Sequence, residues 1–116
     1  EIMANTFKVK TNGAMPASSG TPLTLYTVPS STTAVGLSLT LCNIHTAAVT
    51  ASVQLVSDTS DTETNETVFL VKDSPIPVGG TLTIPLKQIM QTTDVMKIDC
   101  SVAAKVDAAL SIMEIT

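Results

Sequence analysis

The sequence predicts an all-β protein, a single antiparallel β-sandwich (Ig-like or jelly-roll-like) of seven or eight short strands with an extended N-terminal arm. Period-two alternation of apolar and polar residues dominates the chain, and no segment has a convincing helical period. Turn residues separate the alternating segments at short intervals. Thr and Ser together supply 30 of the 116 residues, and Thr is favoured in strands. A closed up-and-down barrel is the second choice.

Residues 1–22 are expected to form the arm, and residues 23–116 the sandwich domain. Turn-forming residues such as Gly13 and Gly20 interrupt the arm after a short segment that could pair as a strand. An extended arm can add to the sheet edge of a neighbouring subunit through main-chain hydrogen bonds. The candidate assembly residues of the arm are Phe7, Lys8, Val9, Lys10, Met15 and Pro16.

The first strands of the sandwich domain are expected at residues 23–28, 34–43 and 49–56. In the second of these, alternation places Val35, Leu37, Leu39 and Leu41 on one face. Because only a short connection separates the second strand from the third, the two are expected to form a long hairpin.

The later strands are less regular. Residues 68–71 are apolar at every position, which predicts a strand covered on both faces. A strand follows at 81–84, and residues 86–91 fit either one helical turn or an irregular strand. Residues 96–101 alternate well, and a turn leads into a last strand at 106–115.

The composition excludes several functions. Charged residues make up 14% of the chain, against about 25% in an ordinary soluble domain, and aromatic residues 3%. A net charge of −4 and the lack of arginine disfavour binding to nucleic acid. No apolar stretch reaches the roughly 18 residues of a membrane-spanning helix. Since hydrophobic residues still make up 44%, we expect partner surfaces to bury part of them.

The two cysteines are predicted to be free thiols. An immunoglobulin-type bridge would come with a core Trp and a Tyr two residues before the second Cys, but the chain has no Trp and position 98 is Ile. Cys42 shares its alternation phase with Ser38 and Thr40, whereas Cys100 shares its phase with Ile98. Free thiols fit folding in the cytoplasm.

No catalytic or cofactor site is predicted. His45, the only histidine, lies on an expected turn and matches no catalytic motif. The acidic residues Asp58, Asp61, Glu63 and Glu66 lie in a polar stretch, residues 57–67, and are the best candidates for a metal. This stretch lacks the spacing of a calcium loop, so it is predicted to be an exposed, solvated loop without a metal.

The order of these elements resembles that of small all-β virion structural proteins of tailed bacteriophages, particularly those that infect marine bacteria and cyanobacteria. The similarity covers most of residues 23–116 and is one of pattern rather than of a diagnostic motif. The segments that carry it are 25–29, 35–43, 49–56, 69–72, 75–82 and 110–116.

The resemblance implies a non-enzymatic part of the virion, assembled in the host cytoplasm. We expect a capsid decoration or cement protein that binds the major capsid protein and further copies of itself through its arm and its apolar, Thr/Ser-rich surfaces. A homo-oligomer is expected, with a trimer favoured. The alternatives are a neck, tail or fibre protein that contacts the host through residues 57–67, and, less favoured, a carbohydrate-binding sandwich that uses Tyr26.

Overall fold

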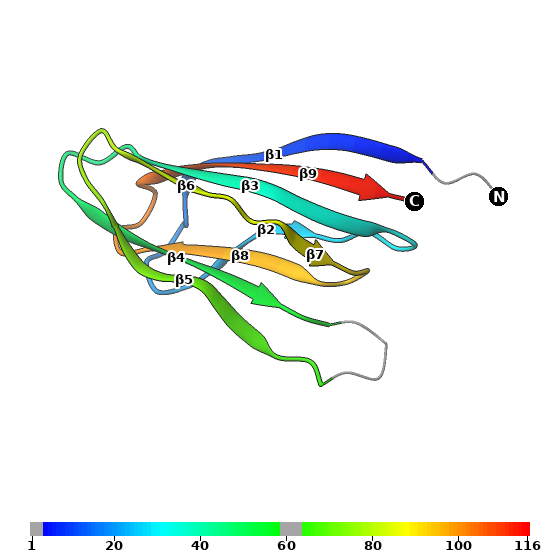
Figure 1. The fold of residues 1–116 in the computed structure, drawn as a ribbon. Helices are drawn as coiled ribbons and strands as arrows, with labels where there is room; N and C mark the ends of the chain where they lie inside the picture. The colour runs from blue at the N-terminus through cyan, green and yellow to red at the C-terminus, as the bar shows by residue number, and fades with distance from the viewer. Residues whose placement is uncertain (1–3, 59–63) are drawn as a thin grey trace.

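The computed structural model describes residues 4–58 and 64–116, which form two antiparallel β-sheets that pack face to face (Figure 1). None of these residues forms a helix of the length and apolarity needed to cross a membrane. The strands are β1 (Asn5–Met15), β2 (Leu23–Thr27), β3 (Thr33–Asn43), β4 (Val49–Val56), β5 (Thr67–Ile76), β6 (Thr81–Ile84), β7 (Gln88–Met90), β8 (Val95–Cys100) and β9 (Val106–Ile115). The prediction of an all-β antiparallel sandwich is confirmed.

The strands pair as a nested series, from the ends of the chain inward. Strand β1 pairs with β9, β2 with β8, β3 with both β6 and β7, and β4 with β5. Successive pairs alternate between the sheets. Sheet A has the order β1-β9-β3-β6, with β7 also on β3, and sheet B has the order β2-β8-β4-β5. This is the order of a jelly roll, the second of the two sandwich types that the sequence predicts.

Aliphatic residues fill the space between the sheets. In β9, each second residue from Val106 to Ile112 is buried, as are Met96 and Ile98 in β8. Each larger aliphatic side chain removed from water contributes about 1.5–3 kcal/mol. The largest fully buried side chains are Met15, Val28, Leu39, Leu41, Val53, Ile76, Met90, Met96, Ile98, Val106, Leu110 and Ile112.

The predicted inner face of β3 is wrong for its first half. Leu39 and Leu41 are fully buried, but Val35 is half-buried and Leu37 is 40% exposed. The cause is a register shift between Gly36 and Ser38 in the pairing with β9. Because one additional residue in a strand reverses the alternation, the strand on one side of this bulge presents the opposite set of side chains to the core.

The predicted hairpin of β3 and β4 is also wrong, because these strands lie in different sheets. Asn43 holds the corner where the chain crosses between them. Its buried amide Nδ2 donates to the carbonyls of Ala47 and Ile76, both at 3.0 Å, while its Oδ1 accepts the His45 N–H at 2.7 Å. The Asn43 side chain thus connects the end of β3 to the corner and to the end of β5.

Strand β5 is an edge strand of sheet B rather than a strand covered on both faces. Val68 is 43% and Phe69 47% exposed. The Lys72 ammonium lies 4.5 Å from the centre of the Phe69 ring, so a cation covers part of this aromatic surface. Since Val68 and Phe69 are consecutive and point to opposite faces, this part of β5 is open to water on both faces, and its continuous apolar sequence was a poor guide.

The segment 86–91 is the irregular strand of the two alternatives. Strand β7 occupies Gln88–Met90 and pairs with the first part of β3, while β6 pairs with the second part. Pro85 separates the two short strands, and Lys87 has φ of 48°. The edge strand of sheet A next to β3 is therefore divided into the two short strands β6 and β7.

Candidate assembly surface

The segment expected as an extended N-terminal arm, residues 1–22, forms the 11-residue strand β1 over half of its length. From Asn5 to Asn12 it pairs with β9 in unbroken register, at one edge of sheet A (Figure 1). A bulge follows, and Met15 and Pro16 then enter the core; Met15 is 1% exposed. These two candidate assembly residues are therefore not accessible to a partner in this fold.

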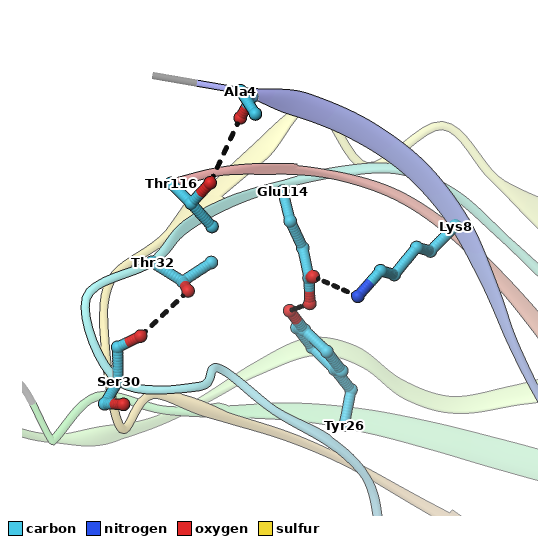
Figure 2. A network of polar contacts seen from close by, with 7 residues as sticks. All are labelled: Ala4, Lys8, Tyr26, Ser30, Thr32, Glu114 and Thr116. Atoms are coloured by element: carbon cyan, nitrogen blue, oxygen red, sulfur yellow. Dashed lines mark hydrogen bonds and ion pairs between the residues drawn. The ribbon is translucent and has the colours of Figure 1, made fainter. Parts of the chain in front are cut away.

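A polar cluster around the buried carboxylate of Glu114 attaches β1 to the rest of the sandwich (Figure 2). Glu114 of β9 is 4% exposed, and its Oε1 lies 2.7 Å from the Nζ of Lys8 on β1. Its Oε2 accepts a 2.5 Å hydrogen bond from the hydroxyl of Tyr26, on β2 of the other sheet. One carboxylate thus connects three strands and both sheets.

The cluster determines the protonation of its members. The hydrogen bond from Lys8, followed by the hydrogen bond from Tyr26, holds the pKa of the Glu114 carboxyl below its usual value. Burial, followed by the contact with Glu114, raises the pKa of the Tyr26 hydroxyl far above its usual value. Glu114 is therefore an anion and Tyr26 a neutral donor at neutral pH. Tyr26 is only 4% exposed, so it offers no platform for a sugar, contrary to the carbohydrate-binding alternative.

An apolar row crosses the outer face of sheet A. Phe7 of β1 faces Met113 of β9, Met113 faces Val35 of β3, and Val35 faces Ile89 of β7. Phe7 and Ile89, at the two ends of the row, are 73% and 64% exposed, and Val9 next to Phe7 is 62% exposed. We refer to Phe7, Met113, Val35 and Ile89 as the outer row. Contiguous exposed apolar surface of this kind marks sites of interaction.

Small and hydroxyl-bearing residues continue this face beyond the outer row. Ser111 faces Ser38, and further along Ala109 faces Thr40, which faces Thr83. Asp107 lies at the far end and accepts the Ala14 N–H at 2.7 Å, where the bulge of β1 leaves that group free of the ladder.

The described part of the acidic stretch is exposed at both ends. Ser57 and Glu66 close it: the Ser57 N–H donates to the Glu66 carbonyl at 2.9 Å, and the Glu66 N–H donates to Ser57 Oγ at 2.8 Å. The Asp58 N–H donates to the buried carboxylate of Asp94 at 2.7 Å. Asp61 and Glu63 lie outside the described residues.

The remaining candidate side chains lie apart from one another. In residues 4–58 and 64–116, no three His, Cys, Asp or Glu side chains gather in a way suited to a metal ion. Cys42, half-buried on β3, and Cys100, buried on β8, are free thiols on different sheets. His45 is part of the β3–β4 corner described above.

Comparisons with known proteins identify the fold. No protein family model matches the sequence, and no curated protein matches it. The solved chains of similar structure include one in a crystal structure of the T13 IBDV viral particle (TM-score 0.61, 14% identity), one in a structure of the Gx strain of infectious bursal disease virus (0.56, 14%), and one in a crystal structure of that virus's VP2 subviral particle (0.53, 18%).

These matches cover 96%, 95% and 94% of this chain but 31%, 33% and 32% of the respective solved chains. The chain thus spans about a third of each of these proteins. At such low identity the likeness concerns the fold: a jelly-roll sandwich of the kind found in chains from viral particles.

Sequence reasoning selected Phe7 and Val9 but missed the outer row. Its other residues, Met113, Val35 and Ile89, come into one row with Phe7 only through the register of four strands. The signal present in the sequence was the small number of charges in these segments, which does not reveal which strands are adjacent.

Proposed function

We propose that this chain is a non-enzymatic structural protein of a bacteriophage particle, and specifically a capsid decoration or cement protein. It binds the assembled shell, through the major capsid protein, and neighbouring copies of itself. The proposal combines the phage resemblance of the sequence pattern with the fold, which is similar to parts of chains in viral particles.

The observation that carries the proposal is the outer row, together with the hydroxyl-rich surface beside it. Burying Phe7 and Ile89 against another protein removes apolar surface from water at about 25 cal/mol for each Å². The surrounding Ser and Thr side chains can form hydrogen bonds at low desolvation cost, because they carry no charge. Such a face suits a permanent subunit of an assembly.

The location in the particle is tested by immunogold labelling of virions of the virus that encodes this chain. Label over the head supports a decoration protein, whereas label at the neck, tail or fibres supports the alternative, in which the exposed stretch around Asp58 and Glu66 contacts the host. Particles without label contradict a virion role.

The surface is tested by co-sedimentation of the purified chain with particles from a virus that lacks its gene. We expect Ile89→Lys to reduce binding at least about tenfold, since it places a charge in the outer row. The matched control is Phe69→Lys, which replaces an exposed apolar residue on sheet B and should leave binding within about twofold. Equal effects of the two substitutions would contradict the assignment of the face.

A further inference from the structure

The main-chain groups of β1 that face away from the sandwich can be identified from its pairing. Ala4 and Thr116 exchange two backbone hydrogen bonds, at 3.2 and 3.0 Å. Since bonded and non-bonded pairs alternate in an antiparallel ladder, and the register is unbroken up to Asn12, the even-numbered residues of β1 bond to β9. The N–H and C=O groups of Asn5, Phe7, Val9 and Thr11 therefore point to the open edge.

This edge differs from the other three sheet edges. Strands β6 and β7 have four and three residues and are separated by Pro85, and β2 has five residues with a bulge. Strand β5 carries two register shifts, Pro75 and the charged residues Lys72 and Asp73. These are the devices that protect sheet edges from pairing with other chains.

Strand β1 has eleven residues, contains no proline and keeps its register over its first eight. Both of its lysines, Lys8 and Lys10, point toward the inner side of sheet A. Glu114 neutralises the Lys8 charge there, which would otherwise oppose pairing at this edge. No strand covers this edge among residues 4–58 and 64–116.

We infer that the open edge of β1 pairs with β1 of a second copy of this chain, antiparallel about a two-fold axis, so that sheet A continues from one copy into the other. The inference rests on the proposed function and deepens it by naming the partner at this edge. A two-fold contact requires a surface that is complementary to itself, and the alternating donors and acceptors of an antiparallel strand edge meet this condition.

Charge excludes the registers on one side of the pairing that is centred on Phe7. When Phe7 faces Phe7 of the second copy, Asn5 faces Val9, and Lys8 faces Thr6. Sliding the strands by one bonded pair in one direction places Lys8 against Lys8, and by two places Lys8 against Lys10, which like-charge repulsion disfavours. The Phe7-centred register keeps the lysines apart.

The same register makes the outer row continuous across the two copies. Phe7 lies at the β1 end of the row, and cross-strand aromatic pairs stabilise adjacent strands. The row would run from Ile89 of one copy through both Phe7 side chains to Ile89 of the other. This arrangement is a dimer, in place of the trimer that the sequence favours.

The test is sedimentation equilibrium of the full chain between about 1 µM and 1 mM. We expect the mass to rise with concentration toward twice the 12.0 kDa of one chain. Phe7→Lys should weaken the dimer at least about tenfold, while the control Val78→Lys, at a turn residue that is 58% exposed, should leave it unchanged. An equimolar mixture of Phe7→Lys and Phe7→Glu should recover the dimer, because residue 7 then meets the opposite charge.

A second variant tests the main-chain pairing. Val9→Pro removes an N–H that points to the open edge and is not used within sheet A, so the monomer should fold and the dimer should dissociate. A chain that is monomeric at every concentration, or a dimer indifferent to both Phe7→Lys and Val9→Pro, overturns the inference. A monomer that still binds virus particles overturns the two-fold pairing alone, whereas a dimer absent from virions overturns the proposed function alone.

Discussion

The outer faces of the two sheets differ in what they present to water. Sheet A carries the outer row, with Phe7 at 73% exposure, and ends in the open edge of β1. Sheet B carries Lys97 and Asp99 at the centre of its outer face, and its exposed Phe69 has the Lys72 ammonium over the ring. The charges are thus unevenly distributed: the outer face of sheet B carries them among its strands, whereas the outer row of sheet A has none, as expected if a partner covers sheet A.

The first test of this contrast removes the group that holds β1 on sheet A. Glu114→Ala leaves the buried Tyr26 hydroxyl without its acceptor and Lys8 without its counter-ion. We expect the free energy of unfolding to fall by about 2–3 kcal/mol, as measured by urea denaturation. Glu114→Gln, which retains an acceptor, should lose less; a loss below about 1 kcal/mol for Glu114→Ala would show that β1 is held by its ladder with β9.

The second test titrates the same cluster. The pKa of Glu114 is lower in the folded protein than its ordinary value of 4.5, so the folded state favours the carboxylate. This contribution to stability is present above pH 4.5 and is lost as the pH falls through the lowered folded pKa. The stability difference between the wild type and Glu114→Gln, from urea denaturation at several pH values, should narrow on acidification. A constant difference would contradict this account.

The third test concerns the bulge that turns Val35 and Leu37 toward the outer face of sheet A. A Cβ at Gly36 would lie 3.2 Å from Leu86 Cδ1 and 3.4 Å from Met90 Cε. Gly36→Ala should therefore cost about 1 kcal/mol through overpacking, as measured by urea denaturation. The control is Gly13→Ala, whose Cβ would meet its nearest neighbour, Asp107 Oδ1, at an ordinary 3.5 Å. Equal stability of the two variants would indicate that the bulge tolerates a side chain.

The smallest effects separate the two exposed phenylalanines. Phe69→Ser removes a half-exposed ring and its contact with Lys72, which is worth about 0.5–1 kcal/mol at an exposed site. Phe7→Ser should change the stability of the monomer by less than about 0.5 kcal/mol, because its ring is mostly in water already. Thermal unfolding at low protein concentration measures both. A larger cost at Phe7 would mean that its ring packs on its own sheet.

The fold class was predictable because alternation is a local property. In β8 and β9 the buried set follows the period of two that the sequence shows. One wrong prediction lies at the bulge near Gly36, where one additional residue reverses the alternation of buried and exposed side chains. Another lies in β5, where the position of the strand in the fold decides which side chains are exposed. Gly36, a glycine inside a strand, is a local sign of a bulge, but it does not say which half of the strand changes its face. The position of a strand in its sheet depends on its partners and leaves no local mark in the sequence.

The candidate surface was predictable only in part. Phe7 and Val9 attract notice as apolar residues in a polar segment, but Met15 in the same segment belongs to the core. Glu114 contacts Lys8 and Tyr26, which come from distant parts of the chain, so no spacing in the sequence predicts this cluster.

The pairing of β1 with β9 also governs how sheet A is completed. Ala4 and Thr116 lie 112 residues apart in the chain, and β9 is the one partner of β1 among the described strands. Seven strands lie between β1 and β9 in the sequence, so their pairing closes the longest loop between paired strands among the described residues. Contacts of such long sequence separation carry a large loop-closure entropy cost, so we expect β1 to dock late in folding. We therefore expect the strand that carries the open edge to be also the last strand to gain a partner within its own chain.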